Sequence, residues 1–341
     1  MSLRLLNPGP PDDEREPDSL ESEYEQIQEA RRELERPLSD YLTWPYPSLA
    51  HVMSGWAPGE LCIAGAFSGG GKTLFTTNVE HALLMQGRRV YHIGLETRPA
   101  MVRTHFACLR LDQLEREAAR REHRPYHARY YVGDVLSGEA KKRLDWPDME
   151  LALRTEIAAG FRSEYPLMVN KERWLDVHRL TKALEEAAFY GAHLVVIDHM
   201  DHLAIPDGQS AYQASVQVTR RLVEVTQSLG LRVLALSQLN NDAVRGDVLA
   251  RYYPPKPEHF YMGGHKRQVT TYQLGIFRPL DPDVRADDMK AAREGKLEPL
   301  KCTQPNVMGV ALLKHRHYGN REGRVVKLGV EHGSLGDLVQ G

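Results

Sequence analysis

The stretch that most constrains this chain is residues 64–73, AGAFSGGGKT. An apolar run at residues 60–66 leads into it, and a segment with helical periodicity follows from Lys72 to about Gln86. Consecutive glycines let backbone N–H groups converge on phosphate oxygens, and the positive end of the following helix adds to the attraction. A strand, a glycine-rich loop ending in Gly-Lys-Thr and a helix together predict a phosphate-binding loop for a nucleotide.

The residues of this loop have separate expected roles. We expect Lys72 to reach the β- and γ-phosphates and the Thr73 hydroxyl to ligate magnesium. Ala66 stands where the strict pattern has its first glycine, and a methyl group fits there if that position does not touch phosphate closely. A glycine-rich turn that contains Lys-Thr by chance is the alternative. The predicted nucleotide-binding residues are Ser68, Gly69, Gly70, Gly71, Lys72, Thr73 and Leu74.

Three polar residues close other apolar runs. Asp198 lies near the end of HLVVIDHM (193–200), and open α/β sheets bind their ligands at the carboxyl ends of such strands. We expect Asp198 to complete the magnesium shell. Glu96 ends the strand predicted at 88–96 and is placed to activate water at the γ-phosphate; a surface glutamate is the alternative. Gln238, near the end of the strand predicted at 232–239, either senses the γ-phosphate or satisfies loop backbone.

Strand and helix patterns alternate after Leu42. Strands are predicted at 60–66, 88–96, 166–170, 193–200 and 232–239. Helices are predicted at 72–86, from about 99, at 174–190 and at 211–229, and residues 110–150 have a charged, helical pattern. Such alternation predicts an α/β fold with a mostly parallel sheet covered on both faces. Later strands at 270–278, 309–317 and 324–331 predict a C-terminal antiparallel hairpin, turning at YGNREG.

The N-terminal region differs from the rest in charge. Residues 11–40 hold 12 acidic and 4 basic side chains, so the remaining chain carries a net charge of +6, which permits a polyanionic partner. We expect a disordered acidic tail over 1–17, a linker or docking helix over 18–42 and one large domain over 43–341. Leu20, Tyr24, Ile27 and Leu34 form a narrow apolar stripe on that helix. The helix either lies solvated on its own domain or docks on a neighbouring subunit.

The overall composition excludes several classes of protein. The 341 residues are 42% hydrophobic and 26% charged, as in ordinary globular proteins. No apolar run reaches the roughly 18 residues of a membrane span. The first residues lack the apolar core of an export signal. Three separated cysteines, Cys62, Cys108 and Cys302, suggest neither a disulfide framework nor a zinc site. We expect a cytoplasmic protein without a membrane partner.

The motifs together resemble the ATPase domain of DnaB-type replicative helicases. The resemblance runs through about residues 43–331 and is carried by AGAFSGGGKT, GAHLVVIDHMDHL, VLALSQLN and GVALLKHRHYGNREGRVVKLGV, in that order. It implies a RecA-like P-loop NTPase core that uses ATP and Mg²⁺. It also implies a ring, expected to be a hexamer, that moves on single-stranded DNA and unwinds duplex in DNA replication. Alanine is common in that family at the position of Ala66.

The resemblance assigns roles to residues of this chain. It makes Glu96 the catalytic base, Asp198 the magnesium-shell acid and Gln238 the γ-phosphate sensor, beside Lys72 and Thr73. Lys314 and Arg316, in LLKHRH, match a Lys-x-Arg pair that reaches the neighbouring subunit's ATP. Two residues apart on a strand, both side chains share one face. A guanidinium supplied in trans would stabilise transition-state charge. An exposed hairpin with charged edges is the alternative.

The DNA site is predicted in two loops, 199–212 and 240–268. Basic side chains interleaved with tyrosines can neutralise phosphates and stack on bases, and glycines let backbone N–H groups approach phosphates; a solvated loop is the alternative. The sequence departs from the family pattern here, with YMGG at 261–264 and Asn241 where arginine is usual. The predicted DNA-binding residues are Arg245, Arg251, Gly263, Gly264, Lys266 and Arg267.

Other readings of the same motifs stay open. A RecA- or RadA-like recombinase would use ATP to form a filament, and a RecA-like ATPase switch would act on proteins. Only the 18–36 segment precedes the ATPase core, so we expect a version of the family without its N-terminal primase-binding domain. The expected partners are single-stranded DNA, further copies of the chain, and a primase or a helicase loader. His199 and His202 flank Asp201 without the spacing of a known metal site, which predicts loop or surface histidines.

Overall fold

The computed structural model describes residues 17–159, 164–172, 175–204, 210–244, 246–260 and 263–338. It divides into two units, Met1–Tyr41 and Leu42–Gly341. The first unit contains helix α1 (Pro17–Glu35), whose Glu, Gln, Arg and Ala residues are strong helix formers. Tyr24, Ile27 and Leu34 are exposed on it. Residues 1–16 of the predicted acidic tail lie outside the described residues.

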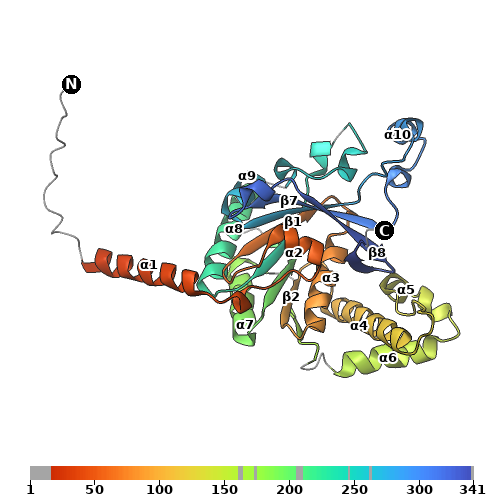
Figure 1. Cartoon of the computed structure of the whole chain (residues 1–341), viewed down its shortest axis with the longest axis horizontal. Helices are drawn as coiled ribbons and strands as arrows, with labels where there is room; N and C mark the ends of the chain where they lie inside the picture. Colours follow the sequence, from red (N-terminus) through yellow and green to blue (C-terminus); the bar gives the residue numbers. More distant parts are fainter. Residues whose placement is uncertain are drawn as a thin grey trace. The chain divides into compact units, whose positions relative to one another are not determined.

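The second unit is organised by a single nine-stranded sheet (Figure 1). Its strand order is β3-β2-β4-β5-β1-β6-β7-β8-β9; neighbours from β3 to β6 are parallel, and neighbours from β6 to β9 are antiparallel. The predicted mostly parallel sheet with antiparallel strands at its C-terminal end is therefore confirmed. The strands are β1 (Leu61–Ala66), β2 (Val90–Gly94), β3 (Leu167–Val169), β4 (Leu194–Asp198), β5 (Val233–Gln238), β6 (Tyr272–Phe277), β7 (Val307–His315), β8 (Val325–Glu331) and β9 (Ser334–Asp337).

Helices cover both faces of this sheet, because the buried strands present apolar side chains to both sides. In β1, Cys62, Ala64 and Ala66 pack against α2 (Pro47–Met53), α3 (Lys72–Met85) and α4 (Pro99–Arg121). Leu61 and Ile63 belong to the other core, with α7 (Val177–Tyr190) and α8 (Ala211–Ser228). The remaining helices are α5 (Val132–Ser137), α6 (Trp146–Ala159), α9 (Gly263–Val269) and α10 (Ala286–Arg293). None of the described helices combines the length and hydrophobicity that crossing a bilayer requires.

Two regions differ from the sequence-based expectation. The segment expected to be helical over 110–150 is three helices, because α4 ends at Arg121 and α5 begins only at Val132. A small separate core around Cys108, Met149 and Leu153 holds this region together. Strand β9 was not expected; it is four residues long and extends the sheet by pairing with β8.

Candidate nucleotide site

The loop between β1 and α3 has a shape that requires glycine. Gly69 and Gly71 have φ angles of 74° and 94°, which side chains rarely allow. A Cβ at Gly70 would lie 2.8 Å from the carbonyl oxygen of Phe67, and one at Gly71 would lie 2.8 Å from Met308 Cε. The backbone therefore turns tightly into the first turn of α3. The N–H of Gly70 closes this turn by donating to the Phe67 carbonyl at 2.8 Å, and the turn can direct the N–H groups that follow it towards an anion, as the glycine pattern predicts.

Lys72 opens α3 and lies directly over this loop. Its Nζ donates to the carbonyl oxygen of Ala66 at 3.3 Å. Burial lowers the pKa of the Lys72 ammonium, although nearby carboxylates, Asp198 foremost, oppose the shift. Ala66 itself is fully buried, with its methyl group in the core beneath the loop. Alanine therefore fits at this position without entering the phosphate side of the loop.

Asp198 and Thr73 form the part of the site suited to a magnesium ion. The Thr73 hydroxyl donates to Asp198 Oδ2 at 3.3 Å. Asp198 is only 3% exposed, and its Oδ1 has no hydrogen-bond partner among the described residues. An unpartnered buried carboxylate oxygen beside a hydroxyl fits a hard cation that takes oxygen ligands. These residues therefore fit Mg²⁺, the ion that the sequence pattern predicts.

Glu96 lies next to this pair because β2 and β4 are neighbouring parallel strands. Gly94 is in register with Asp198, and the N–H of Leu95 donates to the Asp198 carbonyl at 2.7 Å. The Glu96 side chain is 59% exposed, and its Oε2 is 3.4 Å from Nε2 of His199. Burial lowers the pKa of His199, against the opposing charge of Asp201. A carboxylate so placed faces solvent at the same edge as the phosphate loop.

Gln238 ends β5, in register with Ala66 of β1. Its N–H donates to Asp201 Oδ2 at 2.6 Å, so the strand end is tied to the segment that follows β4. Lys266 of α9 completes this network: its Nζ lies 2.8 Å from Asp201 Oδ1 and 2.8 Å from Ser237 Oγ. Hydrogen bonds of Asp201 and Ser237 thus join the segment after β4, the end of β5 and α9.

Lys266 is not available for the DNA contact that we predicted from sequence. Its side chain is 1% exposed and its ammonium is ion-paired with Asp201. A buried charge is stabilised by its partner and is costly to separate, so Lys266 is an internal anchor of α9. The correction concerns Lys266 alone, because its neighbour Arg267 is exposed and lies 3.5 Å from Glu322.

The other predicted DNA residues have different surroundings. Arg251 is half-buried, and its Nε has no hydrogen-bond partner among the described residues. Gly263 and Gly264 are the first two residues of α9. Arg245 lies outside the described residues. Both predicted loops follow the carboxyl ends of neighbouring strands, β4 and β5, and therefore begin at the nucleotide edge of the sheet.

Lys314 and Arg316 lie at the opposite end of the strands from the phosphate loop, beside the start of β6. The Lys314 ammonium donates to carbonyl oxygens at the end of α9, those of Arg267, Gln268 (3.3 Å) and Thr270 (2.6 Å). Arg316 donates to the carbonyl of Val269 at 3.2 Å, so both side chains lie on one face. Burial, followed by the charges of Arg316 and Arg267, lowers the pKa of Lys314 to about 8. Neither side chain reaches the phosphate loop of its own chain.

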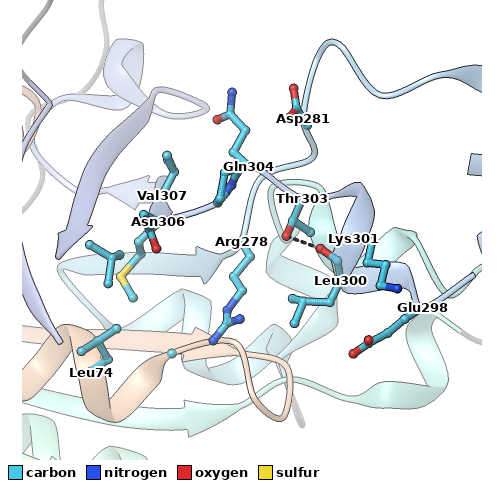
Figure 2. A pocket seen from close by; sticks show the side chains of 14 residues that line it. Leu74, Arg278, Asp281, Glu298, Leu300, Lys301, Thr303, Gln304, Asn306 and Val307 are labelled. Carbon is cyan, nitrogen blue, oxygen red and sulfur yellow. Dashed lines mark hydrogen bonds between the residues drawn. The ribbon is translucent and has the colours of Figure 1, made fainter. Parts of the chain in front are cut away.

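A cavity of about 590 Å³ opens beside the phosphate loop, bounded by Gly71 and Leu74. Figure 2 shows Arg278 extending into it from the end of β6, between Leu74 and Leu300. Asn306, the residue before β7, lies beside Val307 in this lining. This cavity was not predicted from the sequence, because half of its lining residues belong to segment 298–306, whose sequence has no strand or helix periodicity. The signal in the sequence was that this segment connects β6, which pairs with β1, to the next strand, β7.

Comparison with known proteins follows the same lines. The family described as DnaB-like helicase C terminal domain matches residues 42–247, more than half of the chain. A solved ATPase domain is similar over 96% of this chain and 100% of its own chain, with a TM-score of 0.60 and 18% identity. A DnaB-like replicative helicase, described with its interactions with primase, is similar over 96% of this chain and 68% of that chain, with a TM-score of 0.60 and 17% identity. No curated protein sequence matches the chain.

These results agree with the resemblance expected from the motifs. At such identities the structural likeness shows the fold, and the family match carries the assignment. The chain belongs to the family of DnaB-like helicase C-terminal domains, the helicase-type ATPases.

Proposed function

We propose that this chain is the ATPase subunit of a ring-shaped motor that moves on single-stranded DNA and unwinds duplex during DNA replication. The observation that carries this proposal is the position of Lys314 and Arg316. They lie at the amino-terminal end of the parallel strands, whereas the phosphate loop of the same chain lies at the carboxyl end. Their side chains therefore cannot reach that loop.

The sheet register supplies the distance. Met308, near the start of β7, contacts Gly71 of the phosphate loop. Lys314 is six residues further along this strand, roughly 20 Å away at about 3.4 Å per residue. The N–H of Arg316 donates to the carbonyl of Thr271, and the N–H of Thr271 donates to Leu61, the first residue of β1. Cations at that end are too far from the phosphate loop of their own chain to contact its nucleotide, so any nucleotide that they contact would belong to another copy, which supports head-to-tail assembly.

The chemistry of hydrolysis needs residues from both copies. In one copy, the loop N–H groups and Lys72 would hold the phosphates, and Thr73 with Asp198 would hold Mg²⁺. The ion would neutralise charge on the phosphate oxygens. Glu96 would accept a proton from the attacking water. The neighbour's Lys314 and Arg316 would stabilise the charge that develops on the transferred phosphoryl group.

The nucleotide base and sugar would occupy the 590 Å³ cavity beside Gly71 and Leu74. It lies directly against the loop that would hold the phosphates, and its wall mixes apolar and polar side chains, as ligand sites do. Arg278, which is exposed and points into the cavity, is placed to lie against the base. We infer that this side chain orients the nucleotide, while the phosphate loop supplies most of the affinity.

The DNA would contact the two loops that follow β4 and β5. Both loops begin beside the γ-phosphate-sensing position Gln238, and the Asp201 network joins them to α9. A change at the strand ends can therefore reach both loops at once. Arg251 and the exposed Arg267 remain proposed phosphate contacts. Helix α1, with its exposed Tyr24, Ile27 and Leu34, would dock on a neighbouring subunit.

Strand displacement on a forked duplex with a 5′ tail tests the proposal, comparing the full chain with Lys72→Ala. The expected result is ATP-dependent displacement by the unmodified chain only, with closed rings in negative-stain images. Open helical filaments without displacement would favour a recombinase. ATP hydrolysis indifferent to single-stranded DNA would favour a switch that acts on proteins.

A further inference from the structure

Three potential metal ligands meet at the nucleotide edge of the sheet. The carboxylate of Glu96 and one ring nitrogen each of His199 and His202 lie within 4.8 Å of one another. Glu96 follows β2, whereas both histidines belong to the segment after β4, so the cluster exists only in the folded chain. His199 is buried, and the other two side chains are exposed. The buried His199 therefore fixes one side of the cluster, and the other two side chains leave it open to solvent.

The local backbone explains why the histidines face the same way. His202 is the last residue of a short 3₁₀ helix, Met200–His202, and His199 is its N-cap residue. A 3₁₀ helix has three residues per turn, so side chains at i and i+3 lie over each other. The two imidazole rings are indeed 4.1 Å apart between centroids, at an angle of 78°. One further ligand, Glu96, then completes three donors on one side of a potential ion.

A second carboxylate stands behind the buried histidine. Nε2 of His199 faces Glu96 at 3.4 Å, and its Nδ1 faces Asp201 Oδ2 at 3.8 Å. That Nδ1 is buried and has no hydrogen-bond partner among the described residues. Asp201 is itself fixed by Lys266 and by the N–H of Gln238. Metal-binding histidines usually donate their second N–H to such a carboxylate, which sets the tautomer and the ring orientation.

We propose that Glu96, His199 and His202 form a binding site for a divalent transition-metal ion of the zinc class, separate from the Mg²⁺ site at Thr73 and Asp198. Two imidazoles and one carboxylate are the donors that such ions prefer, whereas Mg²⁺ takes oxygen ligands. A cavity of about 400 Å³ lined by His199, Asp201 and His202 gives the ion an entry path.

Occupation of this site has a consequence for catalysis, which rests on the proposed function. Glu96 cannot bind a zinc-class ion and accept a proton from water with the same carboxylate. The bound ion would therefore inhibit ATP hydrolysis, even when Mg²⁺ and ATP are saturating. The three cysteines of the chain are all buried, so they offer such an ion no competing exposed thiolate.

Cobalt(II) is the probe for the site, because its visible d–d absorption reports ligand number without any need for enzymatic activity. The chelator-treated full chain is titrated with Co²⁺ and then with Zn²⁺. We expect one Co²⁺ ion to bind with the intense absorption of a site with few ligands. Zn²⁺ should then displace the Co²⁺ and remove this absorption. His202→Ala should weaken Co²⁺ binding by at least the roughly 10–100-fold that loss of a supporting partner costs. The matched control is His178→Ala, an exposed histidine on α7.

The outcomes separate the site from its consequence. Equal Co²⁺ binding by wild type and His202→Ala would overturn the site. A Zn²⁺ inhibition of Mg²⁺-dependent ATPase that His202→Ala removes and His178→Ala keeps would support inhibition through the site. Inhibition that persists in His202→Ala would overturn that part of the proposal. Absence of any ATPase activity in the wild type assayed with Mg²⁺ and without Zn²⁺ would count against the proposed function, while the Co²⁺ titration would still decide the site.

Discussion

Replacing Lys266 by methionine tests whether this side chain anchors α9 or contacts nucleic acid. The ammonium is 1% exposed and lies 2.8 Å from Asp201 Oδ1. Methionine keeps much of the alkyl chain but leaves the Asp201 carboxylate without its ion pair. Removing one partner of a buried pair costs roughly 3–5 kcal/mol. Asp201 is 15% exposed and retains the N–H of Gln238, so we expect the lower end, about 3 kcal/mol.

Urea unfolding of the chain, followed under conditions in which it is monomeric and at one fixed protein concentration, measures this loss of stability. The double variant Lys266→Met/Asp201→Asn should recover about 1 kcal/mol, because a neutral amide leaves no uncompensated charge. Arg267→Met is the matched control on the same helix. Its side chain is exposed, so its unfolding midpoint should barely change.

Single-stranded DNA binding at several salt concentrations supplies the second measurement. Each lost phosphate contact should reduce the slope of log K against log salt by about 0.7 for single strands. We expect that reduction for Arg267→Met and no reduction for Lys266→Met. An unchanged unfolding midpoint for Lys266→Met together with a slope reduced by about 0.7 would refute the anchor and restore the sequence-based prediction.

Three further predictions concern the nucleotide site. Arg316→Ala should retain ATP binding and lose about 10³-fold or more in turnover. Mixing this variant with Lys72→Ala should restore part of the ATPase activity. Normal turnover by Arg316→Ala alone would argue against a role in trans. The pKa of Lys314 lies at about 8, below the ordinary lysine value, so its ammonium is lost as the pH rises through that value. Turnover should fall over the same range, and Lys314→Arg, which stays charged, should move the fall to higher pH; an identical pH profile would contradict this role. Gly71→Ala places a methyl group 2.8 Å from Met308 at a φ of 94°, so it should cost about 1–3 kcal/mol in stability or ATP affinity, seen by calorimetry.

The phosphate loop and the parallel sheet could be predicted because their signals are local. Strand, glycine loop, Lys72 and helix are consecutive in sequence, and an apolar run that ends in Asp198 marks a buried strand in the same way. The chemistry of each residue type then limits what the site can hold. Physical pattern therefore predicts the elements and the edge at which they bind a ligand.

Properties that depend on distant partners could not be predicted in this way. The charge and position of Lys266 indicated a DNA contact, and only its proximity to Asp201, 65 residues earlier, shows that it is buried. His199 and His202 have no metal spacing by themselves, because the third proposed ligand, Glu96, follows a different strand, β2. Half of the residues that line the cavity beside Leu74 belong to segment 298–306, whose hydrophobic residues follow neither a helix nor a strand period.

The placement of the phosphate loop and the Lys314/Arg316 pair at opposite ends of the strands has a genetic consequence. In the proposed head-to-tail assembly, a copy without Arg316 would bind nucleotide normally but would disable the site of the copy next to it. A defective allele would thus be dominant, because it spoils healthy gene products that co-assemble with it. A copy without Lys72 harms chiefly its own site. On co-expression with a normal allele, Arg316 variants should therefore be more strongly dominant-negative than Lys72 variants.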